Sequence, residues 1–405
     1  MVSGAAFFAE KLAKHFSEHD HEVLVLTASD RPDPYQLDQS NLSVVRCRSF
    51  HNPFRTSQRF SLWPHTHVLR YLTKFAPDLI HLHDPFQFAI SSLYFSRSRN
   101  IPVVLTIHQL PWFVSAYLPT WGRAQLLSES LLWCYARWIL KRCAGLVAGT
   151  QTTANVIYSN TGIRPQIISS GLDLSIFSPD ISKNDRGNTL SLRLGIPEEV
   201  PIILHLGRLD RDKQVDRVVL AAAIAMQQTT AHLLIVGDGT EKLKLMQLCT
   251  QLGIGERSHF PGFISAKNDL AALYQRSSVF VTASEIETQG IVLLEAAACA
   301  LPIVTVQATC LHEIVHEGVN GFLLCPGDQE GMAECLSKLI ENPKLAHEMG
   351  QKGRQLVESH AEENTFAAYK ELYQTIVQER SGIYSPKEAL PGHSSISNTI
   401  KLTKT

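Results

Sequence analysis

Residues 201–240 read PIILHLGRLDRDKQVDRVVLAAAIAMQQTTAHLLIVGDGT. The apolar runs at 202–206 and 232–236 have the length and β-branched content of buried strands, and each is followed by a glycine turn. Between them, residues 213–227 have the apolar spacing of a helix. A strand, a helix and a strand in this order predict a parallel sheet that is covered by helices on both faces.

The same unit recurs along the 405-residue chain. Further strand-like apolar runs lie at 23–27, 79–83, 102–107, 145–149, 279–283 and 302–306. Helical patterns lie at 5–19, 124–142, 151–160, 240–252, 267–276, 290–299, 311–317 and 360–380. This alternation predicts an α/β protein of doubly wound, Rossmann-like domains.

Charge divides the chain into two parts. Residues 1–170 carry a net charge of +6 and the remaining residues carry −7, within a total of −1. The segment 165–200, with a Gly-Leu-Asp turn and a polar run, is typical of a link between domains. We therefore predict an N-terminal domain at 1–175, a C-terminal domain at 176–360 and a disordered tail at 381–405.

Composition excludes several classes of protein. Hydrophobic residues make up 44% of the chain and charged residues 19%, which excludes global disorder. No run approaches the roughly 18 apolar residues of a membrane span, and we expect no signal peptide. The eight cysteines form no CxxC pair. Reduced thiols in a cytosolic protein are therefore expected.

The N-terminus departs from a complete Rossmann-type half. The chain opens with MVSGAAFFAEKLAKHF, a glycine turn that leads into a helix. Such a half normally opens with a strand before this turn, and only Met1 and Val2 are available for it. Either the first strand is missing or the start lies within a longer frame.

The sequence LGRLDRDKQVD at 206–216 carries the first chemical signal. Gly207 allows close approach to the backbone, and Arg208 and Lys213 can reach one shared anion. Two cations at a strand-to-helix junction suit a diphosphate, with Arg as a forked donor and Lys as a point charge. A solvated basic loop is the alternative. The later VGDG at 236–239 is typical of a structural turn.

The sequence SEIETQGIVLLEA at 284–296 carries the second signal. Glu287 lies in the loop after a strand, and Glu295 lies two turns into the following helix. The start of that helix, near Gly290, Ile291 and Val292, offers unpaired backbone N–H groups and the positive end of a helix dipole. A nucleotide diphosphate could bind there, with the two carboxylates accepting from ribose and sugar hydroxyls.

Polar side chains end two strands of the N-terminal half. His108 follows one apolar strand, and His81, His83 and Asp84 end another. Strand ends of this kind form ligand sites in α/β sheets, and a His/Asp group there can orient hydroxyl groups. The alternatives are polar residues that only cap loops, or a zinc site formed by the three histidines.

Aromatic and basic residues alternate in one stretch of the N-terminal half. Four of the five tryptophans, beginning with Trp112, lie between 112 and 138. Rings at headgroup level with basic groups on anionic lipid would suit a membrane interface. A core helix whose basic ends extend outward explains the same composition.

Taken together, the motifs resemble those of the retaining glycosyltransferases of the GT4 type, which have the two-domain GT-B fold. The resemblance runs from about Ser3 to about Tyr373 and rests on SGAAFFAEKLAKHFSEHDHEVLVLT, PDLIHLHDP, TIHQLP, GTQTTANVI, SSGLDLSIFSP, LHLGRLDRDK, IVGDG, FPGF and ETQGIVLLEA. It implies that helix 361–380 packs back on the N-terminal domain. It also implies a nucleotide-sugar donor, a UDP-sugar, with no cofactor, no metal and no nucleic-acid partner.

The resemblance also assigns roles to residues. Arg208 and Lys213, with Gly207, would bind the donor diphosphate, Glu295 the ribose and Glu287 the transferred sugar. Backbone near Gly290, Ile291 and Val292 would touch phosphate and sugar. Phe263 and Ile264 would lie near the base, and Gly4 would be the glycine of the N-terminal loop that faces the donor phosphates. His108 would be the active-site histidine, near the sugar and the incoming acceptor. We further predict that His83, Asp84 and Trp112 bind the acceptor.

The acceptor is suggested by two short motifs. ETQG, and HQLPWFVSAYLP after the strand at 102–107, look like the branch that glycosylates diacylglycerol. A hexosyltransferase, with glucose as the hexose, would then act peripherally on the cytoplasmic face of a membrane and contact anionic lipid. A soluble or polysaccharide hydroxyl is the alternative acceptor, and a non-catalytic binding module would follow if the short N-terminus disables the chemistry. A nucleotide-dependent dehydrogenase is a weaker alternative, because this sequence lacks the GxGxxG motif of that class.

Overall fold

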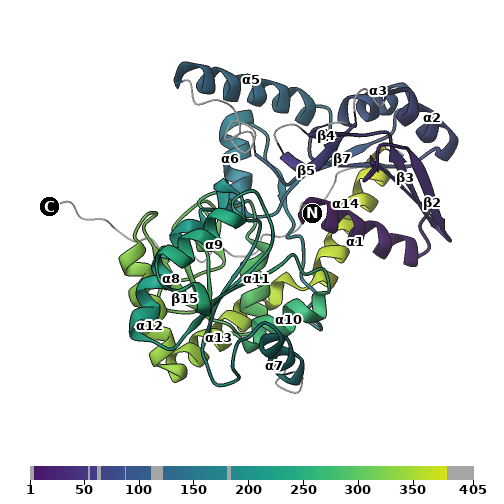
Figure 1. Cartoon of the computed structure of the whole chain (residues 1–405). Coiled ribbons are helices and arrows are strands. Elements are labelled where there is room, and N and C mark those ends of the chain that lie inside the picture. Colours follow the sequence, from purple (N-terminus) through teal and green to yellow (C-terminus); the bar gives the residue numbers. More distant parts are fainter. Residues whose placement is uncertain are drawn as a thin grey trace, which may run out of the picture.

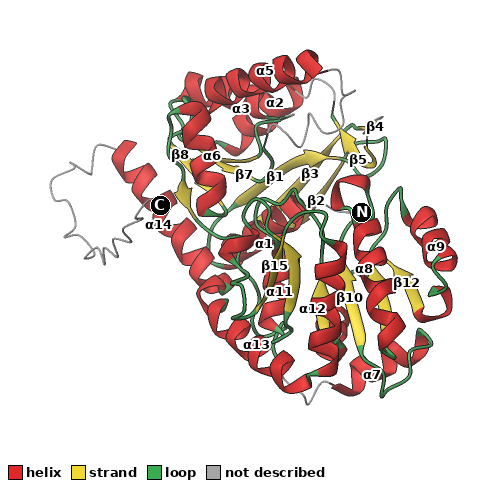
Figure 2. Cartoon of the chain, turned by 90° about the vertical axis from the view of Figure 1, so that its left-hand side faces the viewer, coloured by secondary structure: helices red, strands yellow, loops and turns green. Residues whose placement is uncertain are grey.

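Six parallel strands form the sheet of the C-terminal half. In a computed structural model, which describes residues 4–52, 55–61, 65–86, 88–110, 122–179 and 184–380, they lie in the order β12-β11-β10-β13-β14-β15. Figure 2 shows them running side by side between layers of helices. Their bounds are β10 (Ile202–Leu206), β11 (His232–Val236), β12 (Ser258–Gly262), β13 (Val279–Val281), β14 (Ile303–Val306) and β15 (Gly321–Leu324).

Helices cover both faces of this sheet. Val219 of α8 (Val215–Gln228), Cys249 of α9 (Lys242–Gln251) and Leu336 of α12 (Gln329–Glu341) belong to one buried cluster. Tyr274 of α10 (Lys267–Arg276) and Leu294 of α11 (Ile291–Ala298) belong to the cluster on the other face. The central strands are buried on both faces, which explains why their sequences are apolar without alternation. The remaining helices of this half are α7 (Asn184–Arg193) and α13 (Pro343–Leu356).

The strand order reverses between β10 and β13. From β10 the chain first adds β11 and β12 on one side, and then β13, β14 and β15 on the other. At such a switch point the loops at the carboxyl ends of the two strands diverge and leave room for a ligand. The loops at 207–214 and 282–290 emerge here, so both chemical motifs of this half reach the same edge.

The N-terminal half contains separate sheets within the described residues. One has the order β1-β3-β2, in which β1 and β3 are parallel, and another has four parallel strands in the order β6-β7-β8-β9. The strands are β1 (Val23–Ala28), β2 (Tyr35–Gln39), β3 (Leu42–Cys47), the hairpin β4 (Phe50–Asn52) and β5 (Arg55–Phe60), β6 (Ile80–His83), β7 (Val103–Ile107), β8 (Gly145–Ala148) and β9 (Gln166–Ile167). The helices are α1 (Gly4–Glu18), α2 (His65–Phe75), α3 (Ala89–Arg99), α5 (Gly122–Leu140) and α6 (Gln151–Thr161).

The last described helix, α14 (Glu362–Arg380), leaves the C-terminal half and packs on the N-terminal half, as Figure 1 shows. The Tyr369 hydroxyl is hydrogen-bonded to Thr106 Oγ1 at 2.8 Å, and the Tyr373 hydroxyl lies 2.6 Å from His81 Nδ1. Tyr369 and Ile376 are buried in the cluster that contains Phe8 of α1. The two halves are therefore joined by more than one crossing of the chain.

The two crossings lie side by side. Leu172 N donates to His360 O at 2.8 Å, and Glu362 N donates to Leu172 O at 3.0 Å. Gly171 has φ +66°, and a Cβ at this position would lie 2.5 Å from Thr365 Oγ1. Glycine is required in the interdomain turn because the second crossing is packed against it.

The helix predicted at 311–317 was wrong in length. Only Leu311–Glu313 form a short 3₁₀ helix, η4. The buried Asn320 side chain forms hydrogen bonds with the backbone groups that follow η4. Its Oδ1 accepts from His316 N at 2.7 Å, and its Nδ2 donates to Ile314 O at 2.9 Å. These side-chain bonds replace the backbone bonds that would have continued a helix.

Candidate active site

Two loops of the C-terminal half meet beside the switch point. Lys213 ends the 3₁₀ helix η2 (Arg211–Lys213) after β10, and Glu287 lies in the loop after β13. Lys213 Nζ is 2.5 Å from Glu287 Oε1, and both side chains are largely buried. Nζ also lies 3.4 Å from Ser284 Oγ and from Ile286 O. The structure thus brings together the predicted lysine and one predicted carboxylate, which are 74 residues apart in sequence.

Arg208 lies in the same loop and has two acidic partners. Its guanidinium forms ion pairs with Asp210 and, at 2.6 Å, with Asp212. Asp210 Oδ1 in turn accepts from Thr240 N at 3.1 Å. These carboxylates orient the guanidinium at the start of the loop that follows β10. Sequence reasoning identified the cation and missed the partners, although their spacing of two and four residues was a signal for them.

The VGDG turn supports this loop from the neighbouring strand. Gly237 has φ +144°, and a Cβ there would lie only 1.8 Å from Gly207 O. No side chain fits between these two turns. The motif therefore has the structural role expected for it. Gly207 lies where the loops that follow β10 and β11 begin.

Two helices from different halves begin at the same place. Gly290 has φ +66° and precedes α11, whose first amides, at Ile291 and Val292, have no partner within the helix. A Cβ on Gly4, the first residue of α1, would lie 3.6 Å from Ile291 Cδ1. The positive ends of both helix dipoles therefore face one region, which favours an anion.

Glu295 lies one helical turn further along α11. Its Oε2 accepts a hydrogen bond of 2.9 Å from the buried Tyr274 hydroxyl, a partner that the sequence did not reveal. Burial raises the pKa of Glu295 to about 7, although the bond from Tyr274 and the charges of Lys267 and Lys11 act in the opposite direction. Lys11 belongs to α1, so this carboxyl also lies near the boundary of the two halves.

A second polar group lies at the carboxyl ends of β6 and β7. His83 Nδ1 and His108 Nε2 are 3.0 Å apart, and Phe8 packs against both rings. Asp84 Oδ1 accepts from His108 N at 2.7 Å and from Gln109 N at 3.0 Å. Burial lowers the pKa of His108 to about 4 and raises that of Asp84 to about 7. The imidazole is therefore neutral at pH 7.

One hydrogen bond connects this group with the donor-side loop. Thr288 Oγ1 donates to His108 O at 2.9 Å, and Thr288 directly follows Glu287. The next residue, Gln289, accepts from Ser170 Oγ at 2.5 Å and donates to Ser169 Oγ at 2.8 Å. The ETQG motif thus lies between the two halves, and its Thr and Gln hold the loop to the N-terminal half.

His81 does not join the polar group as a metal ligand. Its Nδ1 lies 2.6 Å from the Tyr373 hydroxyl, and its Nε2 lies 2.8 Å from Thr106 Oγ1. In the described part of the chain, no group of three or more His, Cys, Asp or Glu side chains is placed to hold a metal ion. The structure gives the three-histidine zinc alternative no support, since both ring nitrogens of His81 already have protein partners.

Of the remaining predicted residues, two follow β12 and one lies outside the described chain. Phe263 follows the edge strand β12 and is 47% exposed, whereas Ile264 packs partly buried on the cluster around α10 and α11. Trp112 lies outside the described residues, as does the predicted tail at 381–405.

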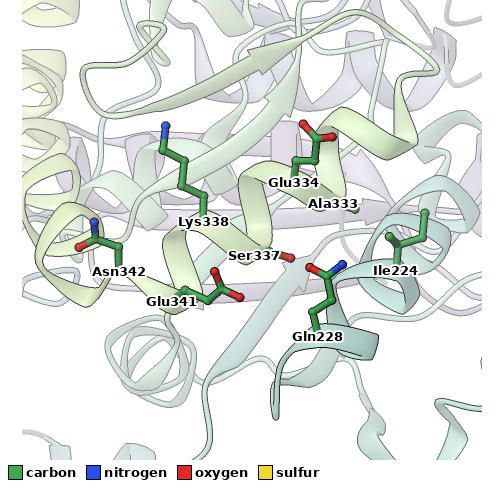
Figure 3. Close-up of a pocket in the computed structure, with 8 residues that line it drawn as sticks. All are labelled: Ile224, Gln228, Ala333, Glu334, Ser337, Lys338, Glu341 and Asn342. Carbon is green, nitrogen blue, oxygen red and sulfur yellow. The ribbon is translucent and has the colours of Figure 1, made fainter.

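One hollow of the described structure lies elsewhere. It measures about 510 Å³ and lies between the end of α8 and α12, as Figure 3 shows. Gln228 is the last residue of α8, whose first residue, Val215, follows the Lys213 loop. This hollow is therefore near the amino ends of the strands, opposite the loops described above. No predicted site residue lines it.

Comparisons with known proteins define the class. Residues 2–176 match the family model described as Glycosyltransferase Family 4, and residues 189–356 match the one described as Glycosyl transferases group 1. The chain belongs to the GT4-type glycosyltransferases and has the GT-B fold. The protein is accordingly a glycosyltransferase enzyme.

Several curated relatives align over most of the chain. It is 26% identical to sulfoquinovosyl transferase SQD2 of Arabidopsis thaliana, covering 89% of this chain and 68% of the relative. It is 25% identical to N-acetyl-alpha-D-glucosaminyl L-malate synthase of Bacillus anthracis, with coverage of 93% and 95%. It is 23% identical to alpha-monoglucosyldiacylglycerol synthase of Streptococcus pneumoniae, with coverage of 85% and 77%.

Solved structures share the fold. Sucrose-phosphate synthase from Thermosynechococcus elongatus superposes with a TM-score of 0.78 at 21% identity, covering 93% of this chain and 94% of that one. Anabaena HepE in complex with UDP and glucose gives a TM-score of 0.72 at 19% identity, with coverage of 92% and 96%. The GT-B fold expected from the sequence is therefore confirmed.

The raised pKa of Glu295 predicts a pH-dependent effect of Glu295→Gln. Between the ordinary value of 4.5 and about 7, the unfolded carboxyl ionises while the folded one stays protonated, so wild-type stability falls as pH rises through this window. Glu295→Gln has no carboxyl group at this position, so its stability does not fall in this way. We expect its free energy of unfolding, relative to wild type, to rise by about 2 kcal/mol between pH 5 and pH 8 in urea titrations.

A matched control is Glu363→Gln, at an exposed glutamate of α14. Its stability relative to wild type should stay constant over the same pH range. An equal pH dependence in both variants would contradict the assignment of the effect to burial of Glu295.

Proposed function

We propose that this enzyme moves glucose from UDP-glucose to the hydroxyl group of a diacylglycerol-type membrane lipid, with retention of the anomeric configuration. The observation that carries the donor half of this proposal is the junction of the two domains. There Lys213 pairs with Glu287, which lies four residues before the start of α11, and the start of α1 lies beside Ile291. Positive helix ends and a lysine suit the binding of a diphosphate.

The donor side would act on the leaving group. As the bond between the sugar and the diphosphate breaks, negative charge grows on the phosphate, and the sugar becomes positively charged. Arg208, Lys213 and the amides of Ile291 and Val292 would stabilise that negative charge. The Lys213 ammonium has three N–H donors, so it can contact a phosphate oxygen and keep its bond to Glu287. Glu287 would accept from sugar hydroxyls.

The nucleoside would extend along the C-terminal half. Glu295 would accept from the ribose hydroxyls, and its bond from Tyr274 supports this role because it fixes the carboxyl before the nucleotide binds. Phe263 and Ile264 would contact the base. No metal or cofactor is assigned a step in this proposal.

The acceptor would approach from the N-terminal half. His108 is neutral, so its ring can accept a hydrogen bond from a hydroxyl group, and His83, Asp84 and Trp112 would complete the acceptor contacts. The acceptor oxygen attacks the anomeric carbon on the face that the phosphate leaves. A new C–O bond replaces the old one, and the acceptor proton passes to a leaving-group phosphate oxygen. Closure of the halves excludes water, which would otherwise hydrolyse the donor.

Apolar surface next to the acceptor side supports a lipid acceptor. A small apolar hollow begins at Phe86 and Ile107, beside His108, and extends to Leu132 and Trp133 of α5. This helix lies along the outer edge of the N-terminal half in Figure 1. No helix in the described ranges has the length and apolarity needed to cross a membrane. Peripheral binding is the mode of contact that we propose.

Exposed aromatic and basic side chains also lie on, or just after, α5 and α6. Leu131 of α5 is 70% exposed and Trp138 is 42% exposed, with the Arg142 guanidinium 4.1 Å from the Trp138 ring centroid. Tyr158 of α6 is exposed too, with Arg164 over its ring. Rings paired with cations suit the headgroup region of anionic lipid. Two relatives are named alpha-monoglucosyldiacylglycerol synthase, which agrees with this acceptor class.

The direct test is product analysis. Purified protein is incubated with UDP-glucose and a lipid extract, and the lipids are examined by mass spectrometry. A new lipid species heavier than diacylglycerol by one hexose residue is expected. Transfer only to water-soluble acceptors would overturn the lipid half of the proposal, and transfer only from another nucleotide sugar would overturn the donor.

The diphosphate role predicts a large effect of Lys213→Ala. Removing one preorganised charge from a leaving-group site costs on the order of 100-fold or more in turnover. We expect a loss of this size in kcat, with an unchanged circular dichroism spectrum. Lys244→Ala is the control, because Lys244 is an exposed residue of α9 that pairs with Glu241. Full activity of Lys213→Ala would remove the lysine from the mechanism.

The membrane surface predicts a second effect. In flotation with vesicles of equimolar phosphatidylglycerol and phosphatidylcholine, wild-type protein should float with the lipid. The double variant Leu131→Ala/Trp138→Ala should partition about tenfold less, because two interfacial side chains are lost. Leu243→Ala, at a 73% exposed position of α9, should behave as wild type. Failure of the wild-type protein to float would favour a soluble acceptor, and equal flotation of all three proteins would remove Leu131 and Trp138 from the membrane contact.

A further inference from the structure

The first turn of α6 is capped partly by the opposite half of the chain. Gln151 N and Thr152 N donate to the two carboxylate oxygens of Glu313, at 2.9 and 2.7 Å. Thr153 N donates to the N-cap hydroxyl of Thr150 at 3.2 Å. These three amides have no partner within the helix itself. Glu313, from the C-terminal half, therefore completes the cap of a helix in the N-terminal half.

Glu313 belongs to a segment that also supports the donor-side loop. It ends η4, which follows β14. Earlier in the same segment, Thr309 Oγ1 accepts a hydrogen bond of 3.2 Å from Glu287 N. One short stretch of chain thus contacts the proposed sugar-binding residue with one side chain and α6 with another.

The donor-side loop itself contacts the same turn of α6. Thr288 O accepts hydrogen bonds from the Thr150 and Thr153 hydroxyls, at 3.1 and 3.0 Å. Its own hydroxyl donates to His108 O at 2.9 Å. The relative position of Glu287 and His108 therefore depends on how α6 lies against residues 287–290.

We propose that Glu313 is a positioning residue for glycosyl transfer. Its carboxylate holds the first turn of α6 against the C-terminal half, so that Thr288 can join the loop of Glu287 to His108. Glu313 acts through these contacts and not by touching a substrate. The contact spans more than 160 residues of sequence, and it exists only when the two halves are together.

The physical basis is a negative charge at the positive end of a helix. Both carboxylate oxygens are used, each by one backbone N–H, which makes these charge-assisted bonds. Glu313 is only partly buried, so salt weakens the contact and water can replace it. A bond of this kind can break and re-form as the halves open and close.

Glu313→Ala tests the contact, and Glu317→Ala is its matched control. Glu317 also places a carboxylate on a backbone amide, that of Leu323, but within the C-terminal half alone. Hydrogen exchange followed by mass spectrometry is measured on the free proteins. In Glu313→Ala, peptides over 149–153 and 284–290 should exchange about tenfold faster than in wild type, while Glu317→Ala should leave them unchanged.

The same variants are compared in kinetics and binding. UDP binding, measured by calorimetry, should change less than about twofold in Glu313→Ala, because Arg208 and Lys213 remain in place. The turnover number with UDP-glucose and diacylglycerol should fall about tenfold, the range of one charge at a helix N-terminus. Glu313→Gln, whose amide oxygen can accept one of the two bonds, should recover part of this loss.

Gln151→Pro removes one donor from the other side. Proline is tolerated as the first helical residue, and Thr150, with φ −144° and ψ 157°, has the extended conformation that precedes proline. The helix should therefore persist without the Gln151 N–H. In the double variant with Glu313→Ala, the loss of turnover should be smaller than the product of the two single losses, because both changes break the same contact.

Two results would overturn the proposal. One is wild-type exchange in both peptides of Glu313→Ala. The other is independent, multiplicative effects of Glu313→Ala and Gln151→Pro. The exchange measurement needs no substrate. It therefore tests the positioning role of Glu313 even if the enzyme uses another sugar or acceptor than those proposed above.

Discussion

The site depends on hydrogen bonds that hold the loop 284–290 between the two halves of the chain. Glu287 of this loop is paired with Lys213 on the C-terminal side. Thr288 and Gln289 bind His108 O, Ser169 and Ser170 on the other side. A loop has few contacts of its own to define its conformation. The partners on both sides supply them, so the donor-side carboxylate has a defined position only where the halves meet.

The two halves contribute different chemistry to this junction. Charged groups gather on the C-terminal side, where Arg208 pairs with two carboxylates and Lys213 pairs with one. On the N-terminal side burial lowers the pKa of His83 and of His108, so neutral rings face the junction. This division fits an enzyme that stabilises a charged leaving group on one side and receives a hydroxyl group on the other.

Local sequence patterns predicted the regular elements best. Apolar runs such as 202–206 and 232–236 became strands because burial on both faces selects such runs in a parallel sheet. The pattern at 311–317 misled because Asn320, several residues later, bonds the backbone groups that a helix would need. Arg208, Lys213 and Glu287 were predicted to be site residues from their place after strands, but their acidic and hydroxyl partners were not predicted.

The sequence by itself determined the strand–turn–helix units, the polar residues at strand ends and, through its motifs, the glycosyltransferase family. These depend on interactions between residues near in the chain. Only the tertiary structure decided that Tyr274 supports Glu295, that Tyr373 reaches His81 and that Glu313 caps α6. Such pairs form because sheet order and the return of α14 place distant segments together, and no local pattern encodes that placement.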